Sequence, residues 1–420
     1  MLLLFLYLIN LYIRPQDWAP LFYAWPVDYI IIIPALLAGL VMQSAENKKT
    51  VKNPQYGLLI ALLLIIFASN AVHGNIVFGF DQFIKFSKKA CIFIMILLFI
   101  NSTKKLKTIM FFIVLLSSFI AYQAIAQFIS GGVGFAGQDF YHSGEGLRTA
   151  WVGLWNGSNI TALLLNVSIP FAIEFAFGPY PFYWRMFNIV LTACLIGGVY
   201  TTNSRGGFVT LLAILFIYPI VRLKKKKSAI IIGVFLSVAL LLFMAPSRLG
   251  QFSTDEESAH IRTRLWGNAM DMFKENPILG IGGGRFIEEN GRNMMAHSNF
   301  MQTLAEIGSI GIFIWVGLIY FSFKGLYWVY KLKTVPGTNE ETFKSLARAL
   351  LVSMLGFNIC TLFITMNIDL FYLLIGLCAA AINIMNKEIK PIQMSFTFKD
   401  LIGISGSITV LLLFYHYYTR

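Results

Sequence analysis

The segment Met295-Ala296-His297-Ser298-Asn299 lies in the last part of the longest polar interruption in this sequence, residues 246–308. An apolar run, residues 300–320, begins directly after Asn299. The interruption contains several arginines, a glycine run and a lone histidine, whereas long apolar runs dominate the rest of the chain. We therefore expect a membrane scaffold that holds this loop at one face of the bilayer.

The composition supports a membrane protein. Of the 420 residues, 57% are hydrophobic and only 13% are charged, whereas a soluble domain has about 25% charged residues. Apolar runs of about 20 residues cross a bilayer as helices, because a helix satisfies its own backbone polar groups there. The candidate spans are residues 2–13, 27–42, 56–72, 83–100, 108–129, 160–177, 186–201, 207–221, 229–245, 300–320, 346–366, 370–385 and 401–418. The sequence thus predicts one all-α transmembrane domain, residues 1–420, with about 12–13 helices and a loop, residues 246–299, between the ninth and tenth spans.

Lysines in the short connections predict the orientation. Five clusters fall on one side of the predicted membrane: Lys48, Lys49 and Lys52; Lys104, Lys105 and Lys107; Lys224 to Lys227; Lys331 and Lys333; Lys387 and Lys390. Positively charged loops stay in the cytoplasm, so the net charge of +13 reflects orientation and no nucleic-acid partner is expected. The long loop then faces outward, where nucleotide triphosphates are absent.

One lysine cluster breaks this pattern. Lys85, Lys88 and Lys89 fall at the outer start of the predicted span 83–100. Long lysine side chains snorkel to lipid headgroups, which is one interpretation. The other is a basic wall for an anionic, lipid-linked substrate.

Arg205 lies in Ser204-Arg205-Gly206-Gly207, between two spans on the outer side. A charge at membrane depth is costly and usually functional. Ser204 is a candidate cap of the next helix, whose N-terminal dipole favours an anion. The alternative is an arginine that snorkels at a helix end.

Arg148 lies in the outer connection, residues 131–155, among Tyr141, Trp151 and Trp155. These aromatic residues are typical of an interfacial belt and equally suit a cleft for sugar rings. Arg148 itself is either a solvated loop charge or an anion ligand.

The long loop contains a stripe at helical spacing, formed by Arg262, Trp266, Met270 and Phe273. This pattern predicts a short amphipathic helix on the membrane surface. Arg262 falls on its apolar side, where it either snorkels or binds a ligand, and Arg264 falls on a different, more solvated face.

The run Gly280-Ile281-Gly282-Gly283-Gly284 looks like a phosphate-cradling loop, but no strand precedes it as a dinucleotide-binding motif requires. A flexible turn is the favoured interpretation.

His297 precedes the apolar run 300–320. A helix N-terminus disfavours imidazolium, so we expect a neutral ring that accepts a proton, as a general base for a sugar hydroxyl must. A structural histidine is the alternative. No second histidine or carboxylate stands at metal-ligand spacing, so we expect no metal.

Several short motifs occur in order: Ser204-Arg205-Gly206-Gly207, Arg262 to Trp266, Asn276-Pro277-Ile278-Leu279-Gly280-Ile281-Gly282, His297-Ser298-Asn299, and Leu304-Ala305-Glu306-Ile307-Gly308-Ser309-Ile310-Gly311. This pattern resembles the O-antigen ligase and polymerase superfamily. Arg148 and Asn159 also resemble the family's element before the middle helices. The N-terminal Tyr12-Ile13-Arg14-Pro15-Gln16-Asp17 is similar to a subgroup of O-glycosylation ligases found with exosortase systems.

The resemblance implies a metal-independent, inverting glycosyltransferase of the bacterial inner membrane, with a GT-C-like fold and a periplasmic active site. Its donor would be a glycan on undecaprenyl pyrophosphate and its acceptor a hydroxyl of lipid A-core or of a protein. Arg205, Arg262 and Arg148 would bind the pyrophosphate, and His297 would activate the acceptor. Arg264, Asn159 and the three lysines are secondary candidates. The alternatives are a polymerase of the same superfamily and a polytopic transporter.

Overall fold

The computed structural model describes residues 1–23, 25–45, 53–140, 147–244, 257–365, 369–391 and 394–419. Helices and their connections make up all of these residues, with no strand among them, which confirms the all-α prediction. The α-helices are α1 (Leu2–Ile13), α2 (Pro15–Trp18), α3 (Val27–Ala45), α4 (Pro54–Ala71), α5 (Ile76–Phe99), α6 (Thr103–Ser130), α7 (Ser158–Phe177), α8 (Phe182–Thr201), α9 (Arg205–Arg222), α10 (Lys226–Met244), α11 (Glu257–Glu275), α12 (Phe286–Glu289), α13 (Asn299–Tyr330), α14 (Asn339–Thr361), α15 (Asp369–Glu388) and α16 (Phe398–Tyr418). The lysine cluster of Lys48, Lys49 and Lys52, Tyr141, and residues 246–256 of the predicted loop lie outside the described residues.

Each predicted apolar run coincides with one helix, and nine helices among the described residues are long and apolar enough to cross a membrane. The polytopic class is therefore confirmed, and nine of the expected spans meet these criteria among the described residues. Helices α1, α3, α5 and α10 are not among the nine. Helix α1 has 12 residues, which is about 18 Å of helix against a hydrocarbon core of about 30 Å. Helix α5 is long, but it contains Asp81 and the three lysines of the predicted outer cluster.

The chain divides into two compact units. Unit 1 consists of Met1–Lys48, Met95–Phe252 and Leu326–Cys360, and unit 2 of Lys49–Ile94, Ser253–Gly325 and Thr361–Arg420. Each unit contains helices that qualify as membrane spans, such as α7 in unit 1 and α15 in unit 2. A single transmembrane domain over residues 1–420 with residues 246–299 as an insertion stays a prediction.

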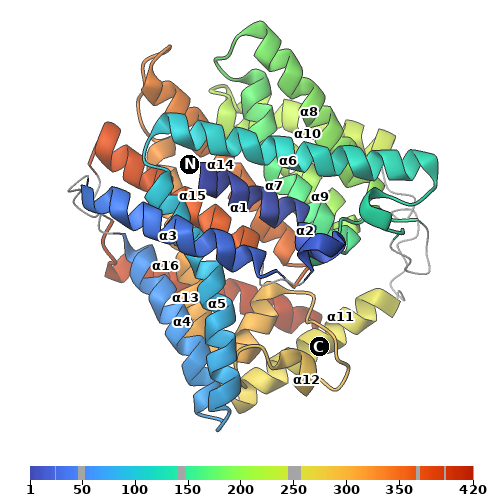
Figure 1. Ribbon diagram of the computed structural model, residues 1–420, viewed down its shortest axis with the longest axis vertical. Helices are drawn as coiled ribbons and strands as arrows, with labels where there is room; N and C mark the ends of the chain where they lie inside the picture. The colour runs from blue at the N-terminus through green and yellow to red at the C-terminus, as the bar shows by residue number, and fades with distance from the viewer. Residues whose placement is uncertain are drawn as a thin grey trace. The chain divides into compact units, whose positions relative to one another are not determined.

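Helix α7 is the centre of unit 1. It is buried along nearly its whole length and packs against α6, α8 and α9 (Figure 1). Helix α9 approaches it closely at Gly207, where a Cβ atom would lie 2.4 Å from the Cβ of Ala162. The side-chain amide of Asn166 also donates to the Gly207 carbonyl at 2.9 Å. These contacts fix the first turn of α9, which begins at Arg205.

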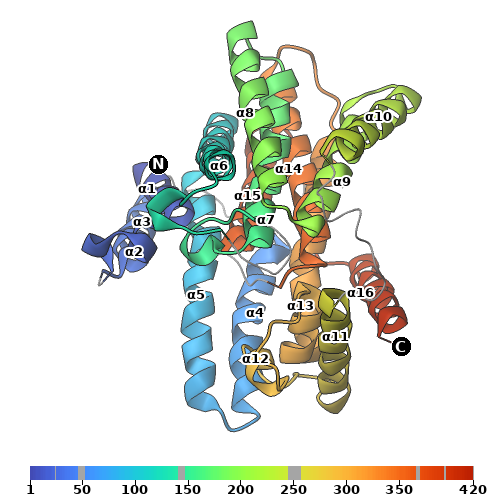
Figure 2. The ribbon, with the colours of Figure 1, turned by 90° about the vertical axis from the view of Figure 1, so that its right-hand side faces the viewer.

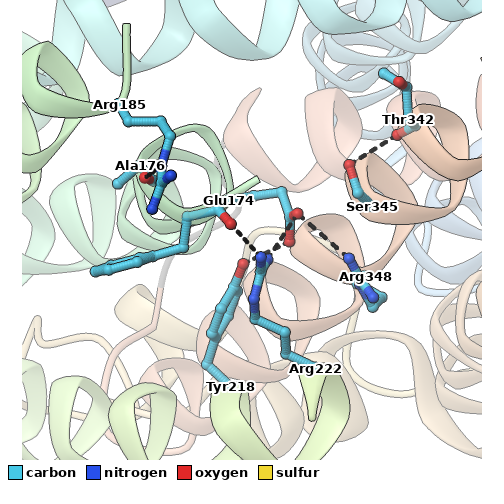
Figure 3. A network of polar contacts seen from close by, with 9 residues as sticks. Glu174, Ala176, Arg185, Tyr218, Arg222, Thr342, Ser345 and Arg348 are labelled. Carbon is cyan, nitrogen blue, oxygen red and sulfur yellow. Dashed lines mark hydrogen bonds and ion pairs between the residues drawn. The ribbon is translucent and has the colours of Figure 1, made fainter. Parts of the chain in front are cut away.

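A buried polar network joins the other end of α7 to α9 and α14 within unit 1. The Glu174 carboxylate is fully buried and accepts hydrogen bonds from Tyr218, from Arg222 at 2.9 Å and from Arg348 at 3.3 Å (Figure 3). A buried carboxylate is tolerated only when it is paired in this way. The single carboxylate of Glu174 therefore compensates the charges of two arginines, one on α9 and one on α14.

Replacing Glu174 with alanine is expected to destabilise the protein strongly. Breaking a buried ion pair by removing one partner costs roughly 3–5 kcal/mol, because the remaining charge is left uncompensated. Thermal unfolding in detergent would measure this loss as a lower Tm. The control is Asp271→Ala, which removes an exposed ion pair with Lys274 and should cost no more than about 1 kcal/mol. Equal Tm shifts in the two variants would contradict a stabilising role for the network.

Unit 2 contains α4 and α5 up to Ile94, which form a hairpin that both views show (Figures 1 and 2). It also contains an interrupted helix. The backbone of α13 is helical except at Gly308, where φ is 62° and ψ is −163°. Residues 277–284, which we call the glycine-rich segment, pair with this interruption. Their backbone bonds are Ser309 N–H to Pro277 O at 2.9 Å, Ile310 N–H to Ile278 O at 3.3 Å, Ile281 N–H to Ala305 O at 3.0 Å and Gly282 N–H to Glu306 O at 3.0 Å.

Gly308 and Gly280 make this pairing possible. A Cβ at Gly308 would lie 2.4 Å from the Ile278 carbonyl oxygen, and one at Gly280 would lie 2.4 Å from the Glu306 backbone. Both glycines also have a positive φ, which residues with a side chain rarely adopt. The glycine-rich segment is therefore a turn, as predicted, and its backbone pairing with α13 holds it in place.

Candidate functional site

His297 lies two residues before α13 in a left-handed backbone conformation, with φ of 53°. Left-handed backbone at a residue other than glycine is uncommon and persists where the surroundings impose it. Both neighbours of His297 are held. The Ala296 carbonyl accepts from the Trp266 indole at 2.9 Å, and the Ser298 N–H donates to the Thr365 hydroxyl at 2.7 Å. The half-buried imidazole is thus presented by a fixed backbone.

Ser298 links this backbone to α16. Its hydroxyl lies 2.7 Å from the Tyr415 hydroxyl and accepts the Met301 N–H at 3.3 Å, which caps the first turn of α13. Tyr415 stacks on Phe300 with ring centroids 5.7 Å apart and meets Trp266 edge-on at 4.9 Å. Four elements of unit 2 therefore converge on the backbone beside His297.

Helix α11 is the amphipathic helix that the sequence predicts. Leu265, Trp266, Ala269 and Met270 are buried on one side. Arg262 is half-buried and close enough to His297 to influence its charge, whereas Arg264 is exposed. Arg264 instead lines an open, polar recess together with Asn268. This arrangement favours Arg262 over Arg264 as the arginine that acts with His297.

The surroundings of His297 favour its neutral form. Burial lowers the pKa of the imidazole, and the positive charge of Arg262 lowers it further. Both effects act in the direction that the sequence predicts from the position of His297 before a helix. A ring with a lowered pKa is neutral at pH 7 and able to accept a proton.

Unit 1 brings Arg205 together with Asn159. Ser204 caps α9 by accepting the Gly207 N–H at 3.1 Å, which confirms the predicted cap. The Ser204 hydroxyl also donates to the side-chain oxygen of Asn159 at 2.6 Å. Asn159 is thus a support for the turn that carries Arg205 at the N-terminus of α9.

Arg148, in the same unit, is only 8% exposed, so its interpretation as a solvated loop charge was wrong. Its Nε atom is buried without a hydrogen-bond partner among the described residues. The next residue, Thr149, anchors it, with N–H and hydroxyl bonds to Thr201 at 3.1 and 3.0 Å. A buried guanidinium with an unused donor is suited to an anionic ligand.

Trp151 and Trp155, near Arg148 in the sequence, stabilise the fold. Trp151 and Trp155 are 3% and 0% exposed, so neither the interfacial belt nor the sugar-binding cleft predicted for them is correct. Their indole N–H groups donate to the Tyr12 and Leu11 carbonyls at 2.7 and 2.8 Å. They satisfy carbonyl groups at the C-terminal end of α1, which have no partner inside the helix.

The predicted lysine cluster does not lie at the start of a helix, because α5 begins at Ile76. Lys85 forms an exposed ion pair with Asp81 at 2.7 Å. Lys89 is half-buried and lies within electrostatic reach of Asp369 and Glu306 and also of Lys88 and Lys85. A basic wall formed by the three lysines stays a prediction.

Glu306 was missed in the sequence, although it stands within an apolar run. It is 7% exposed and lies beside a small recess that Asn299, Gln302, Thr303 and Thr365 also line. A carboxylate at membrane depth is itself a functional signal, and this signal could have identified it. Among the described residues, no group of three or more His, Cys, Asp or Glu side chains could hold a metal ion.

Arg205, Arg148 and Asn159 therefore lie in unit 1, and Arg262 and His297 in unit 2. That the two sets face one cleft stays a prediction.

Residues 190–316 match a family model described as O-antigen ligase. The match includes Arg205, Arg262 and His297 and confirms the resemblance to the O-antigen ligase superfamily over these residues. A search of curated proteins finds no match.

Proposed function

We propose, from the match of residues 190–316 to an O-antigen ligase family model, that this protein is a glycosyltransferase. It moves a glycan from undecaprenyl pyrophosphate to an acceptor hydroxyl of lipid A-core or of a protein. The observation that carries the proposal is the backbone-fixed His297, whose pKa is lowered by burial and by the positive charge of Arg262. A general base must be held in place and unprotonated before it can accept a proton from a hydroxyl.

The reaction is a single displacement with inversion. The acceptor oxygen attacks the anomeric carbon, the bond from that carbon to the pyrophosphate oxygen breaks, and the acceptor proton passes to the His297 imidazole. The electron pair of the broken bond leaves with the pyrophosphate. No nucleotide is required, because the carrier brings the activated bond.

The arginines supply the second requirement. Charge develops on the leaving pyrophosphate, and fixed cationic donors stabilise it most effectively where water is excluded. Arg205 at the N-terminus of α9 and the buried Arg148 meet this description in unit 1, and Arg262 does so beside His297. A positive helix terminus adds to the attraction for a phosphate group.

An outward-facing site in the inner membrane fits the distribution of lysines. The described clusters at the ends of α6, α9, α13 and α15 alternate with connections that contain the candidate residues. By the positive-inside rule, the lysine side is cytoplasmic. We therefore place the reaction at the periplasmic face.

Transfer by the purified protein tests the proposal. Protein in lipid nanodiscs would receive a polyprenyl-pyrophosphate glycan and either lipid A-core or a protein acceptor, with and without chelator. We expect glycan to move to one acceptor at a rate that chelator does not change. Transfer only onto a second carrier-linked glycan would indicate the polymerase instead. Transport of the intact carrier-linked glycan across the bilayer without transfer would overturn the proposal.

Replacing Arg205 with alanine is expected to slow transfer by roughly 10²–10³-fold, the effect of losing one donor to a developing anion. Arg205→Lys should recover only part of this loss, because lysine lacks the planar fork that binds phosphate with two bonds. Initial rates with a polyprenyl-pyrophosphate donor would measure both effects. Arg264→Ala is the control, because Arg264 is exposed on the other face of α11. A larger loss of transfer rate in Arg264→Ala than in Arg205→Ala would contradict the assignment of Arg205 to the pyrophosphate.

A further inference from the structure

Glu306 anchors the first part of α13, residues 299–307, to the glycine-rich segment. Its buried carboxylate accepts a side-chain bond from Gln302 at 2.9 Å, and the backbone N–H groups of Gly284 and Phe286 lie close enough to it to interact electrostatically. One carboxylate thus joins two stretches of chain that lie on opposite sides of His297 in the sequence.

Gln302 continues this connection to His297. While its amide nitrogen donates to Glu306, its oxygen accepts the Ala296 N–H at 3.3 Å. The Ala296 carbonyl is held by Trp266, and Ala296 directly precedes His297. Only one side chain therefore separates the Glu306 carboxylate from the backbone that presents the imidazole.

The glycine-rich segment is itself held by α4. The Gly283 N–H donates to the Ser69 hydroxyl at 3.0 Å, the Asn70 amide donates to the Gly283 carbonyl at 3.1 Å, and a ring nitrogen of His73 lies 2.8 Å from the Gly280 carbonyl oxygen. These bonds give Glu306 a rigid support.

The hydrogen bonds of the glycine-rich segment argue against its interpretation as a phosphate-cradling loop. The N–H groups of Ile281, Gly282 and Gly283 donate, in order, to the Ala305 carbonyl, the Glu306 carbonyl and the Ser69 hydroxyl, and the N–H of Gly284 lies near the Glu306 carboxylate. A phosphate-binding loop must instead direct such groups at its ligand. The segment is used to hold Glu306 and the interruption of α13.

We propose that Glu306 is a positioning residue for His297, acting through Gln302 and Ala296 and braced by the glycine-rich segment. This inference rests on the proposed function in one respect, which is the role of His297 as the general base. Without the Glu306 carboxylate, Gln302 loses its anchor, the Ala296 N–H loses a fixed acceptor, and the left-handed backbone at His297 relaxes.

Reaction with diethylpyrocarbonate tests this positioning without requiring any transfer activity, because the reagent modifies accessible neutral imidazoles. The full chain in nanodiscs would be labelled and the modified histidines quantified by peptide mass spectrometry. We expect His297 to react roughly tenfold faster in Glu306→Ala and in Gln302→Ala, because the loss of one hydrogen bond lets the backbone around His297 open locally. Because both residues belong to one chain of contacts, the double variant should react no faster than Glu306→Ala alone.

The controls are built into the chain. His260 and His416 are exposed and serve as internal references whose labelling should not change. Glu289→Ala removes a carboxylate that pairs with Arg285 next to the same segment and should leave His297 labelling at the wild-type rate. An unchanged His297 rate in Glu306→Ala would overturn the proposal, as would equal acceleration in Glu289→Ala. If Glu306→Ala does not fold, Gln302→Ala carries the test.

Kinetics then separate positioning from catalysis. We expect Glu306→Ala and Gln302→Ala to lower kcat for transfer about tenfold with little change in the donor KM, since neither residue belongs to the proposed pyrophosphate site. Full transfer activity in His297→Ala would refute the proposed function, whereas the labelling rates would still decide whether Glu306 positions His297.

Discussion

Replacing His297 with alanine is expected to abolish measurable glycan transfer while leaving the amount of protein in the membrane unchanged. Loss of a general base costs roughly 10²–10⁴-fold in rate. The protein should remain folded, because Ala296 and Ser298, and not the imidazole, make the hydrogen bonds that fix this backbone. The measurement is transfer by purified protein in nanodiscs, with immunoblotting of membranes for abundance. Normal surface glycosylation by cells with this variant would remove His297 from the mechanism.

The pH dependence of the wild-type enzyme gives an independent check. Burial and Arg262 both lower the pKa of His297, so the active, neutral ring prevails at pH 7 and is lost only as the pH falls through that lowered pKa. We expect the acid limb of kcat/KM to lie below the ordinary histidine value of about 6.5. Arg262→Ala should move this limb to higher pH, because it removes a charge that disfavours imidazolium, even though its maximal rate also falls. If the acid limb of kcat/KM in Arg262→Ala stays at the wild-type pH, the limb reports the titration of a group other than His297.

Local sequence patterns predicted the parts of the site that depend on one helix. The stripe from Arg262 to Phe273 predicts α11 and the buried side of Trp266, and Ser204 before two glycines predicts the cap that positions Arg205. Both features follow from the helical repeat and from hydrogen bonding at a helix N-terminus. Each of these depends on residues that are only a few positions apart in the sequence. The long apolar runs predicted the helices for the same reason.

The remaining features depend on contacts between distant residues. The glycine-rich segment and α4 are far apart in the sequence, yet Gly283 bonds to Ser69 and Asn70. The apolar run after His297 also reads as one uninterrupted span, and nothing local in it shows that Gly308 breaks the helix or that Glu306 faces the segment. Trp151 was misjudged likewise, because its partner is the far end of α1. Propensity and hydropathy contain no information about such partners.

Gly308→Ala is expected to disrupt the interrupted helix and the backbone around His297. The Gly308 conformation belongs to a region that is essentially restricted to glycine, and forcing another residue into it costs about 1–3 kcal/mol. The added Cβ would also lie 2.4 Å from the Ile278 carbonyl oxygen and 2.6 Å from the Gly280 nitrogen. Because both contacts are with backbone, relief requires breaking hydrogen bonds of the pairing, each worth about 1 kcal/mol. We expect a total loss of roughly 3 kcal/mol or more, with transfer lost in parallel.

Thermal unfolding in detergent and limited trypsin digestion at Arg285 and Arg292 would measure this effect, since both arginines lie in the chain that the pairing holds. Gly406→Ala is the matched control. Gly406 lies within α16, and an added Cβ there would meet no atom within 4 Å, so alanine should be neutral or stabilising by about 0.5–1 kcal/mol. A Gly308→Ala protein with wild-type Tm, protease resistance and His297 labelling would mean that the interruption of α13 does not hold the site. A selective loss of protease resistance and of transfer, with α16 unaffected, would connect the break in one helix to the geometry of the catalytic histidine.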